Sequence, residues 1–153
     1  MEIYNIDDYD SYDKQLEIIL RDYIFTCATR RAARMVAKWG DVNTFLYQFD
    51  YQSRWLDFKI GGDYHTSEIY FVFNNAWPPV VHQFNDNDKE FAAIMGGYWT
   101  EFARHGEPGS DWPKFDVDGD AHMHLALPVS TSSNLQKEAC DFHDEILGYE
   151  NDY

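Results

Sequence analysis

The stretch Gly61-Gly62-Asp63-Tyr64-His65-Thr66-Ser67-Glu68-Ile69-Tyr70-Phe71-Val72-Phe73 joins a glycine-punctuated loop, one imidazole and an apolar, aromatic run. Imidazole exchanges protons near neutral pH, because its unperturbed pKa is about 6.5. Loops held by a rigid scaffold often carry catalytic groups, so His65 is a candidate general base. Most histidines have surface or structural roles, and chemistry alone leaves that alternative open. Periodicity cannot decide whether 68–73 forms a strand or a helical turn.

Helical and strand patterns alternate around this stretch and predict an α/β domain. Apolar residues at helical spacing, ended by glycine, indicate the helices, and alternation of apolar and polar residues indicates the strands. Residues 1–21 are polar and acidic, with no element expected. The first expected elements are a helix that begins around Asp22 and stops at Gly40, and a strand over 42–51. A helix over about 87–105, capped by Asn87 or Asp86 and ended by Gly106, follows them. The last two are a short strand over 122–127 and a helix over about 134–147.

The length and charge of the chain limit the classes of protein to which it can belong. The chain has 153 residues, enough for one domain with a sizeable core. Its net charge of −15 argues against binding to nucleic acid or to an anionic membrane, since phosphates would be repelled. No apolar run approaches the roughly 18 residues of a membrane-spanning helix. The acidic first residues lack the apolar core of a signal peptide.

Two segments resemble metal sites but lack required ligands. The run Asp116-Val117-Asp118-Gly119-Asp120 misplaces the glycine of a calcium-binding EF-hand loop and has Leu127 where glutamate is needed, so a solvated turn is expected. His122 and His124 would share one face of a strand, without an apparent third ligand for zinc. We expect no metal and no cofactor in this chain.

A nucleophile for His65 is also missing. Ser67 lies only two residues away, and such neighbours rarely reach nucleophile–base geometry. No two glycines are four residues apart, which excludes the G-x-S-x-G motif of serine hydrolases. Cys27 and Cys140 are compatible with buried thiols or with a disulfide, and the residues alone leave both alternatives open.

Several stretches together resemble the C-terminal part of type-B carboxylesterases, the cholinesterase-like branch of the α/β-hydrolases. The resemblance covers about residues 3–147, and order and spacing agree. The matching stretches are 22–27 with Arg30-Arg31-Ala32-Ala33, 45–49, Gly62 through His65 to Glu68 with 71–73, Tyr98-Trp99-Thr100-Glu101-Phe102-Ala103-Arg104-His105-Gly106-Glu107-Pro108, 112–116, and Cys140-Asp141-Phe142.

The resemblance implies a role for several residues. His65 corresponds to the triad histidine, and Glu68 to a supporting acid near the active site. Cys27 and Cys140 correspond to a disulfide pair, which implies an oxidising, secretory compartment. Gly109 and His143 depart from the family's usual asparagine and tryptophan, and His143 is expected to weaken packing of the last helix.

The fold expected from the resemblance is the C-terminal portion of an α/β-hydrolase, with residues 1–153 forming a single partial domain, an incomplete central sheet and flanking helices. We expect a carboxylic ester hydrolase fragment that is inactive alone. Its expected partners are the missing N-terminal part, in cis or in trans, and a small-molecule ester. The alternatives are a non-catalytic adhesion module and a degenerate fragment.

Overall fold

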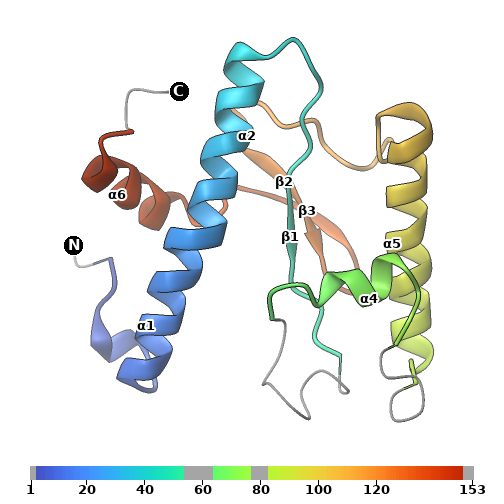
Figure 1. Ribbon diagram of the computed structural model, residues 1–153, viewed down its shortest axis with the longest axis horizontal. Helices are drawn as coiled ribbons and strands as arrows, with labels where there is room; N and C mark the ends of the chain where they lie inside the picture. Colours follow the sequence, from blue (N-terminus) through green and yellow to red (C-terminus); the bar gives the residue numbers. More distant parts are fainter. Residues whose placement is uncertain (1–2, 54–63, 77–82, 150–153) are drawn as a thin grey trace. The chain divides into compact units, whose positions relative to one another are not determined.

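The computed structural model describes residues 3–53, 64–76 and 83–149 (Figure 1). These residues form two compact units, and each combines segments that are far apart in the sequence. Of the described residues, the first unit contains 3–46, 114–121 and 132–149, and the second contains 47–53, 64–76, 83–113 and 122–131. The glycines that precede His65 lie outside the described residues. The mixture of helices with a small sheet confirms the predicted α/β class.

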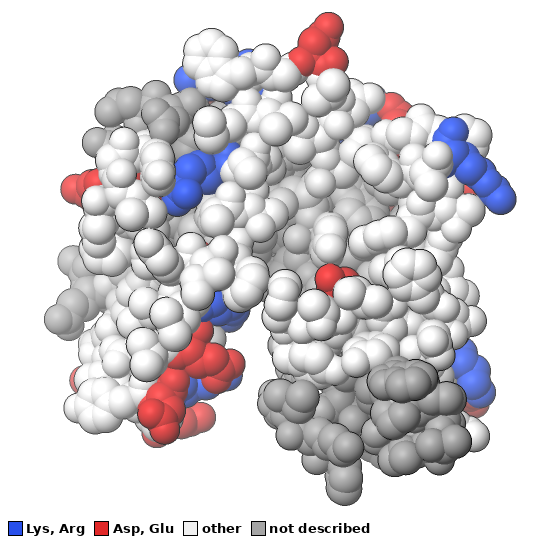
Figure 2. Space-filling model, in the orientation of Figure 1, with Lys and Arg blue, Asp and Glu red and all other residues white. Residues whose placement is uncertain are grey.

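A long helical arm dominates the first unit. After the short 3₁₀ turn η1 (Ile6–Asp8), α1 (Tyr12–Arg21) leads through a π-helical turn, η2 (Asp22–Thr26), into α2 (Cys27–Trp39). In Figure 2, charged side chains gather along one side of α1 next to uncharged ones.

The helical arm begins ten residues earlier than the sequence analysis expected. Ser11 caps α1, because its side chain accepts a hydrogen bond from the Lys14 amide. Asp22 is buried and is the first-turn acid of η2, as expected, but η2 continues directly from α1, so the helical run does not begin there. The acidic composition of residues 1–21 led the sequence analysis to miss this helix, which carries charged residues beside a stripe of apolar ones.

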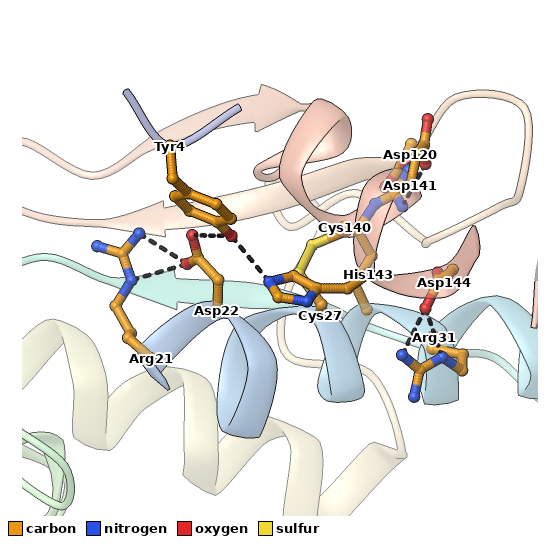
Figure 3. Close-up of a disulfide and its surroundings, with 11 residues drawn as sticks. Tyr4, Arg21, Asp22, Cys27, Arg31, Asp120, Cys140, Asp141, His143 and Asp144 are labelled. Carbon is orange, nitrogen blue, oxygen red and sulfur yellow. Dashed lines mark hydrogen bonds and ion pairs between the residues drawn. A yellow bond between two sulfur atoms is a disulfide. The ribbon is translucent and has the colours of Figure 1, made fainter. Parts of the chain in front are cut away.

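The last helix, α6 (Lys137–Leu147), is held to the helical arm by a disulfide. Cys27 and Cys140 form this bond, both buried, and confirm the pairing that the family resemblance implied (Figure 3). The bond closes a loop with a sequence separation of 113 residues. A small apolar core lies beside it, and its buried members are Ala33, Leu46, Phe115 and Leu135.

Polar contacts join the same elements around the disulfide. The Tyr4 hydroxyl lies 2.9 Å from Nε2 of His143 and donates to Asp22 at 3.2 Å (Figure 3). His143 is therefore buried and hydrogen-bonded in α6, at the position where weaker packing was expected. Arg30 of α2 forms an ion pair with Asp120, and both side chains are buried.

The sheet has three strands in the order β1 (Tyr47–Phe49), β2 (Ala121–Leu125) and β3 (Ser130–Ser133). β1 and β2 are parallel, with Tyr47 opposite Met123 and Phe49 opposite Leu125. The strand expected over 42–51 is thus present but short, and the strand expected over 122–127 is confirmed. β3 was not expected, because its four residues are polar and exposed.

Two helices of the second unit pack together, α4 (Glu68–Val72) and α5 (Asp86–His105). α5 confirms the helix expected over 87–105, including its end at Gly106, where φ is 74°. Its cap is Asn85 rather than Asn87 or Asp86: the Asn85 side chain accepts from the Asp88 amide and the Asp88 carboxylate accepts from the Asn85 amide. For 68–73, the structure resolves the ambiguity in favour of a helix.

Candidate active site

His65 lies in a tight turn that leads directly into α4. The Ser67 amide donates to the Tyr64 carbonyl at 2.9 Å and closes the turn. Thr66 has a φ of 79°, which corresponds to the third residue of a type II turn, where glycine or asparagine is usual. A β-branched residue in this conformation costs on the order of 1–3 kcal/mol. His65 is the second residue of the turn, and it is exposed to solvent.

The turn is anchored through Phe71, which is fully buried one helical turn further along α4. Its ring stacks on Phe84 with centroids 5.1 Å apart and meets Tyr51 and Phe91 edge-on at 5.1 and 5.3 Å. Aromatic pairs at these separations contribute about 0.5–1.5 kcal/mol each beyond their buried area. These contacts hold the short helix α4 firmly, and the turn that carries His65 is therefore fixed at its α4 end.

Glu68, the supporting acid suggested by the sequence, is the first residue of α4 and is partly buried. Burial raises the pKa of the Tyr47 phenol, and the negative charge of Glu68 raises it further. The carboxylate therefore lies close enough to the first residue of β1 to act on it electrostatically. Tyr47 itself packs edge-on against Trp99, 5.4 Å away. His65 thus lies within the turn, and Glu68 directly follows it, three residues further along the chain.

Ser67 has a different environment from its neighbour His65. Ser67 is fully buried, and its Oγ has no hydrogen-bond partner within the part of the chain that the structure describes. Although Ser67 precedes α4, its side chain does not cap the helix. A buried, unpaired hydroxyl costs about 1–3 kcal/mol. Because it is sealed from solvent, Ser67 is unsuited to attack an ester, in line with its rejection as a nucleophile.

Tyr64, which opens the turn, stays protonated at neutral pH. Burial and the hydroxyl of Tyr70, 3.3 Å away, raise the pKa of Tyr64 to about 12. The phenol therefore does not compete with an imidazole as a proton carrier in this part of the molecule.

The two histidines of β2 occupy separate environments. His122 is buried, whereas Nε2 of His124 lies 2.9 Å from Oδ2 of Asp50, the residue that follows β1. Among the described residues, no group of three acidic, histidine or cysteine side chains could hold a metal ion. The sequence analysis missed the pair of Asp50 and His124, which depends on the parallel register of β1 and β2 and has no signal in local spacing.

The acidic run 116–120 forms a turn. Oδ1 of Asp116 accepts hydrogen bonds from the amides of Asp118 and Gly119, at 3.0 and 2.6 Å. The last residue of the run, Asp120, points into the first unit and binds the guanidinium groups of Arg30 and Arg34. Its carboxylate is thus committed to internal ion pairs.

A family model for carboxylesterases matches residues 1–143, which include every element that positions the candidate site. The chain belongs to the carboxylesterase family. Over 75% of its own length, this carboxylesterase-family chain is 27% identical to acetylcholinesterase 1 of Caenorhabditis briggsae. Over 96% of its length it is 30% identical to pyrethroid hydrolase Ces2e of Rattus norvegicus, and over 92% it is 24% identical to cocaine esterase of Homo sapiens.

These alignments cover only a small part of the relatives. The carboxylesterase-family chain spans 20% of the nematode protein, 27% of the rat protein and 26% of the human protein. No helix of its described part is long and apolar enough to cross a bilayer.

Proposed function

We propose that this chain supplies the general base, His65, to a carboxylic ester hydrolase whose nucleophilic serine and oxyanion hole belong to another segment. The observation that carries the proposal is an exposed imidazole held on a turn whose adjoining helix is anchored in an aromatic cluster. Family membership makes ester hydrolysis the natural chemistry for that imidazole. The 153 residues contain no G-x-S-x-G motif, so the nucleophile must come from elsewhere.

In the proposed mechanism, His65 accepts a proton and then donates it in each of the two half-reactions. It accepts the proton of the serine hydroxyl as the serine oxygen bonds to the ester carbonyl carbon, and it donates that proton to the departing alkoxide. Water then attacks the acyl-serine with His65 again as base, which releases the acid and restores the serine. Glu68 supports the site by its negative charge, near the start of α4.

The proposed partner is the remainder of a carboxylesterase domain, joined in cis or in trans. The length of the relatives supports this, because the chain covers only 20–27% of them. Exposed apolar side chains on the helical arm support it too, since they follow helical spacing and would be covered by a neighbouring layer. They are Tyr12, Leu16, Leu20, Tyr23 and Ile24, with exposed fractions between 46% and 74%.

The test is complementation. The chain is mixed or co-expressed with a carboxylesterase segment that contains G-x-S-x-G and lacks its own histidine region, and hydrolysis of a p-nitrophenyl ester is measured. We expect no turnover from either part alone and turnover from the complex. His65→Gln should lower kcat of the complex on the order of 10⁴–10⁶-fold, as loss of a triad histidine does elsewhere.

His105→Gln is the matched control, because His105 is also exposed but lies at the end of α5, in an i,i+4 pair with Glu101. It should leave kcat unchanged. Full activity of the isolated chain would refute the proposal, as would an active complex that tolerates His65→Gln. A complex that forms without activity would instead favour a non-catalytic, adhesion-like module.

We also propose that the chain folds in the secretory pathway. Disulfides persist in oxidising compartments, and the buried bond between Cys27 and Cys140 supports such an origin. Mass spectrometry of the protein from its natural source, alkylated before reduction, should show both cysteines unmodified. Quantitative alkylation of both would contradict the assignment.

A further inference from the structure

We propose that Thr66 is a positioning residue for His65, and that its left-handed backbone conformation sets the direction in which the imidazole projects. This inference rests on the proposed role of His65 as a base. Thr66 itself is not expected to touch the reacting atoms.

Hydrogen bonds hold Thr66 in place from both sides. The Ser67 amide donates to the Tyr64 carbonyl at 2.9 Å, and the Ile69 amide donates to the Thr66 carbonyl at 3.2 Å. The hydroxyls of Tyr64 and Tyr70 meet across the turn at 3.3 Å. With Phe71 buried in the aromatic cluster, the turn cannot relax to negative φ without breaking these contacts.

The identity of residue 66 is unusual for its conformation. Five non-glycine residues of the described part have positive φ, and Thr66 alone among them is β-branched, the class least suited to this region. Three of the others are asparagine or aspartate, which tolerate it: Asn74, Asp120 and Asn134. Strained residues that persist because their surroundings hold them are found predominantly at functional sites. Here the strained residue is the immediate neighbour of the candidate base.

Threonine narrows the range of φ open to position 66, and the surrounding contacts select the left-handed region within that range. Glycine would lower the backbone barrier to other values of φ within the same contacts, so His65 would lose its fixed direction. Asparagine would keep the left-handed conformation at lower strain and still lack the freedom of glycine. A comparison of Thr66→Gly with Thr66→Asn therefore separates the effect of backbone freedom on His65 from the effect of backbone strain.

Two further variants control for local stability. Ser67→Ala removes the buried hydroxyl that has no described partner, without touching the backbone of the turn. Asn74→Gly changes another positive-φ residue, at the far end of α4. Both alter the same helix and neither alters residue 66.

The experiment uses the 153-residue chain with labelled histidine. The side-chain NMR signal of His65 and its modification by diethyl pyrocarbonate, located by peptide mapping, report on the imidazole. We expect Thr66→Gly to broaden or split the His65 signal and to change its modification rate. Thr66→Asn should keep the wild-type signal and raise the melting temperature. Ser67→Ala and Asn74→Gly should keep the wild-type signal.

An unchanged His65 signal in Thr66→Gly overturns the inference, and so does an equal change in either control variant. In the complemented esterase, Thr66→Gly should lower kcat with little change in KM, and Thr66→Asn should restore kcat. If the wild-type complex has no esterase activity, the proposed function fails, whereas the measurements on the imidazole still decide the role of Thr66.

Discussion

The hydroxyl of Tyr4 links two buried side chains, since it lies 2.9 Å from Nε2 of His143 and donates to Oδ2 of Asp22 at 3.2 Å. The three residues come from the start of the chain, from η2 and from α6. Arg21 binds the other oxygen of Asp22 at 2.7 Å. Burial, followed by the charge and hydrogen bond of Asp22, raises the pKa of Tyr4. The phenol therefore remains a donor at neutral pH and ties the N-terminal segment to both helices.

Removing this hydroxyl should weaken the first unit. Tyr4→Phe leaves the imidazole of His143 and one oxygen of Asp22 without this partner, and we expect a loss of about 1–3 kcal/mol in the free energy of unfolding. The midpoint of urea unfolding measures it. Tyr12→Phe is the control, because Tyr12 is 74% exposed, and it should have no measurable effect. Equal midpoints for the two variants would mean that the Tyr4 contacts add nothing.

Removing the buried carboxylate of Asp120 should lower the free energy of unfolding far more than removing an exposed carboxylate. Asp120→Asn removes the buried counter-charge of Arg30, 1% exposed, and leaves it only the half-exposed carboxylate of Asp141 at 3.4 Å; breaking a buried pair costs up to about 3–5 kcal/mol. Asparagine tolerates the positive φ of 45° at this position, so the loss reports on charge. Glu17→Gln removes the exposed pair with Lys14 and should cost below about 0.5 kcal/mol. Comparable urea midpoints for both variants would show that the buried pair is not stabilising.

Two glycines of α5 should respond in opposite directions to alanine. Gly106 ends the helix with a φ of 74°, so Gly106→Ala should destabilise by about 1–2 kcal/mol. Gly97 lies within the helix, and a Cβ there would meet nothing within 4 Å. Gly97→Ala should therefore stabilise by about 0.8–1.0 kcal/mol. Thermal melts of the two variants check the sign, and a raised melting temperature for Gly106→Ala would contradict the αL cap.

Alkaline pH should destabilise the second unit through Tyr98. Burial, and then the hydrogen bond to Asp111 at 2.6 Å, raises the pKa of Tyr98 to about 12 from its ordinary value of 10.0. The unfolded chain thus releases this proton first as pH rises. The stability linked to Tyr98 is complete below pH 10 and is lost as pH rises towards 12.

The measurement is the unfolding midpoint in urea across this pH range, with tyrosinate absorbance as a parallel readout. Tyr98→Phe should lower stability at neutral pH, because Asp111 loses its partner, and should flatten the decline at alkaline pH. Tyr12→Phe again serves as the exposed control and should keep the wild-type slope. An unchanged slope in Tyr98→Phe would assign the decline to other tyrosines.

Local sequence patterns predicted part of this fold well. The apolar spacing over 87–105 and Gly106 located α5 almost to the residue, because a long helix repeats one signal many times. Its cap was missed by one residue, since Asn85 is identified by its backbone conformation and its reciprocal bond to Asp88. The start of α1 at Tyr12 was missed because the acidic residues before it led residues 1–21 to be treated as one polar segment.

The candidate site was predictable only in outline. The residues themselves mark His65 as a candidate base, whereas only the family resemblance gave Glu68 a role and paired Cys27 with Cys140. The pairing of Asp50 with His124, and of Arg30 with Asp120, joins residues 74 and 90 positions apart. Such pairs depend on strand register and helix packing, which no local window contains.

The sequence by itself determined the family, the candidate base and the absence of a G-x-S-x-G nucleophile, because these depend on which residues are present and in what order. Only the tertiary structure decided that 68–72 is helical, that Ser67 is sealed and that Thr66 adopts positive φ beside an exposed His65. The physical reason is that burial and strained backbone conformations arise from what packs around a residue. Here the aromatic cluster around Phe71 packs α4, the helix that follows the turn, and the members of the cluster come from separate segments of the chain.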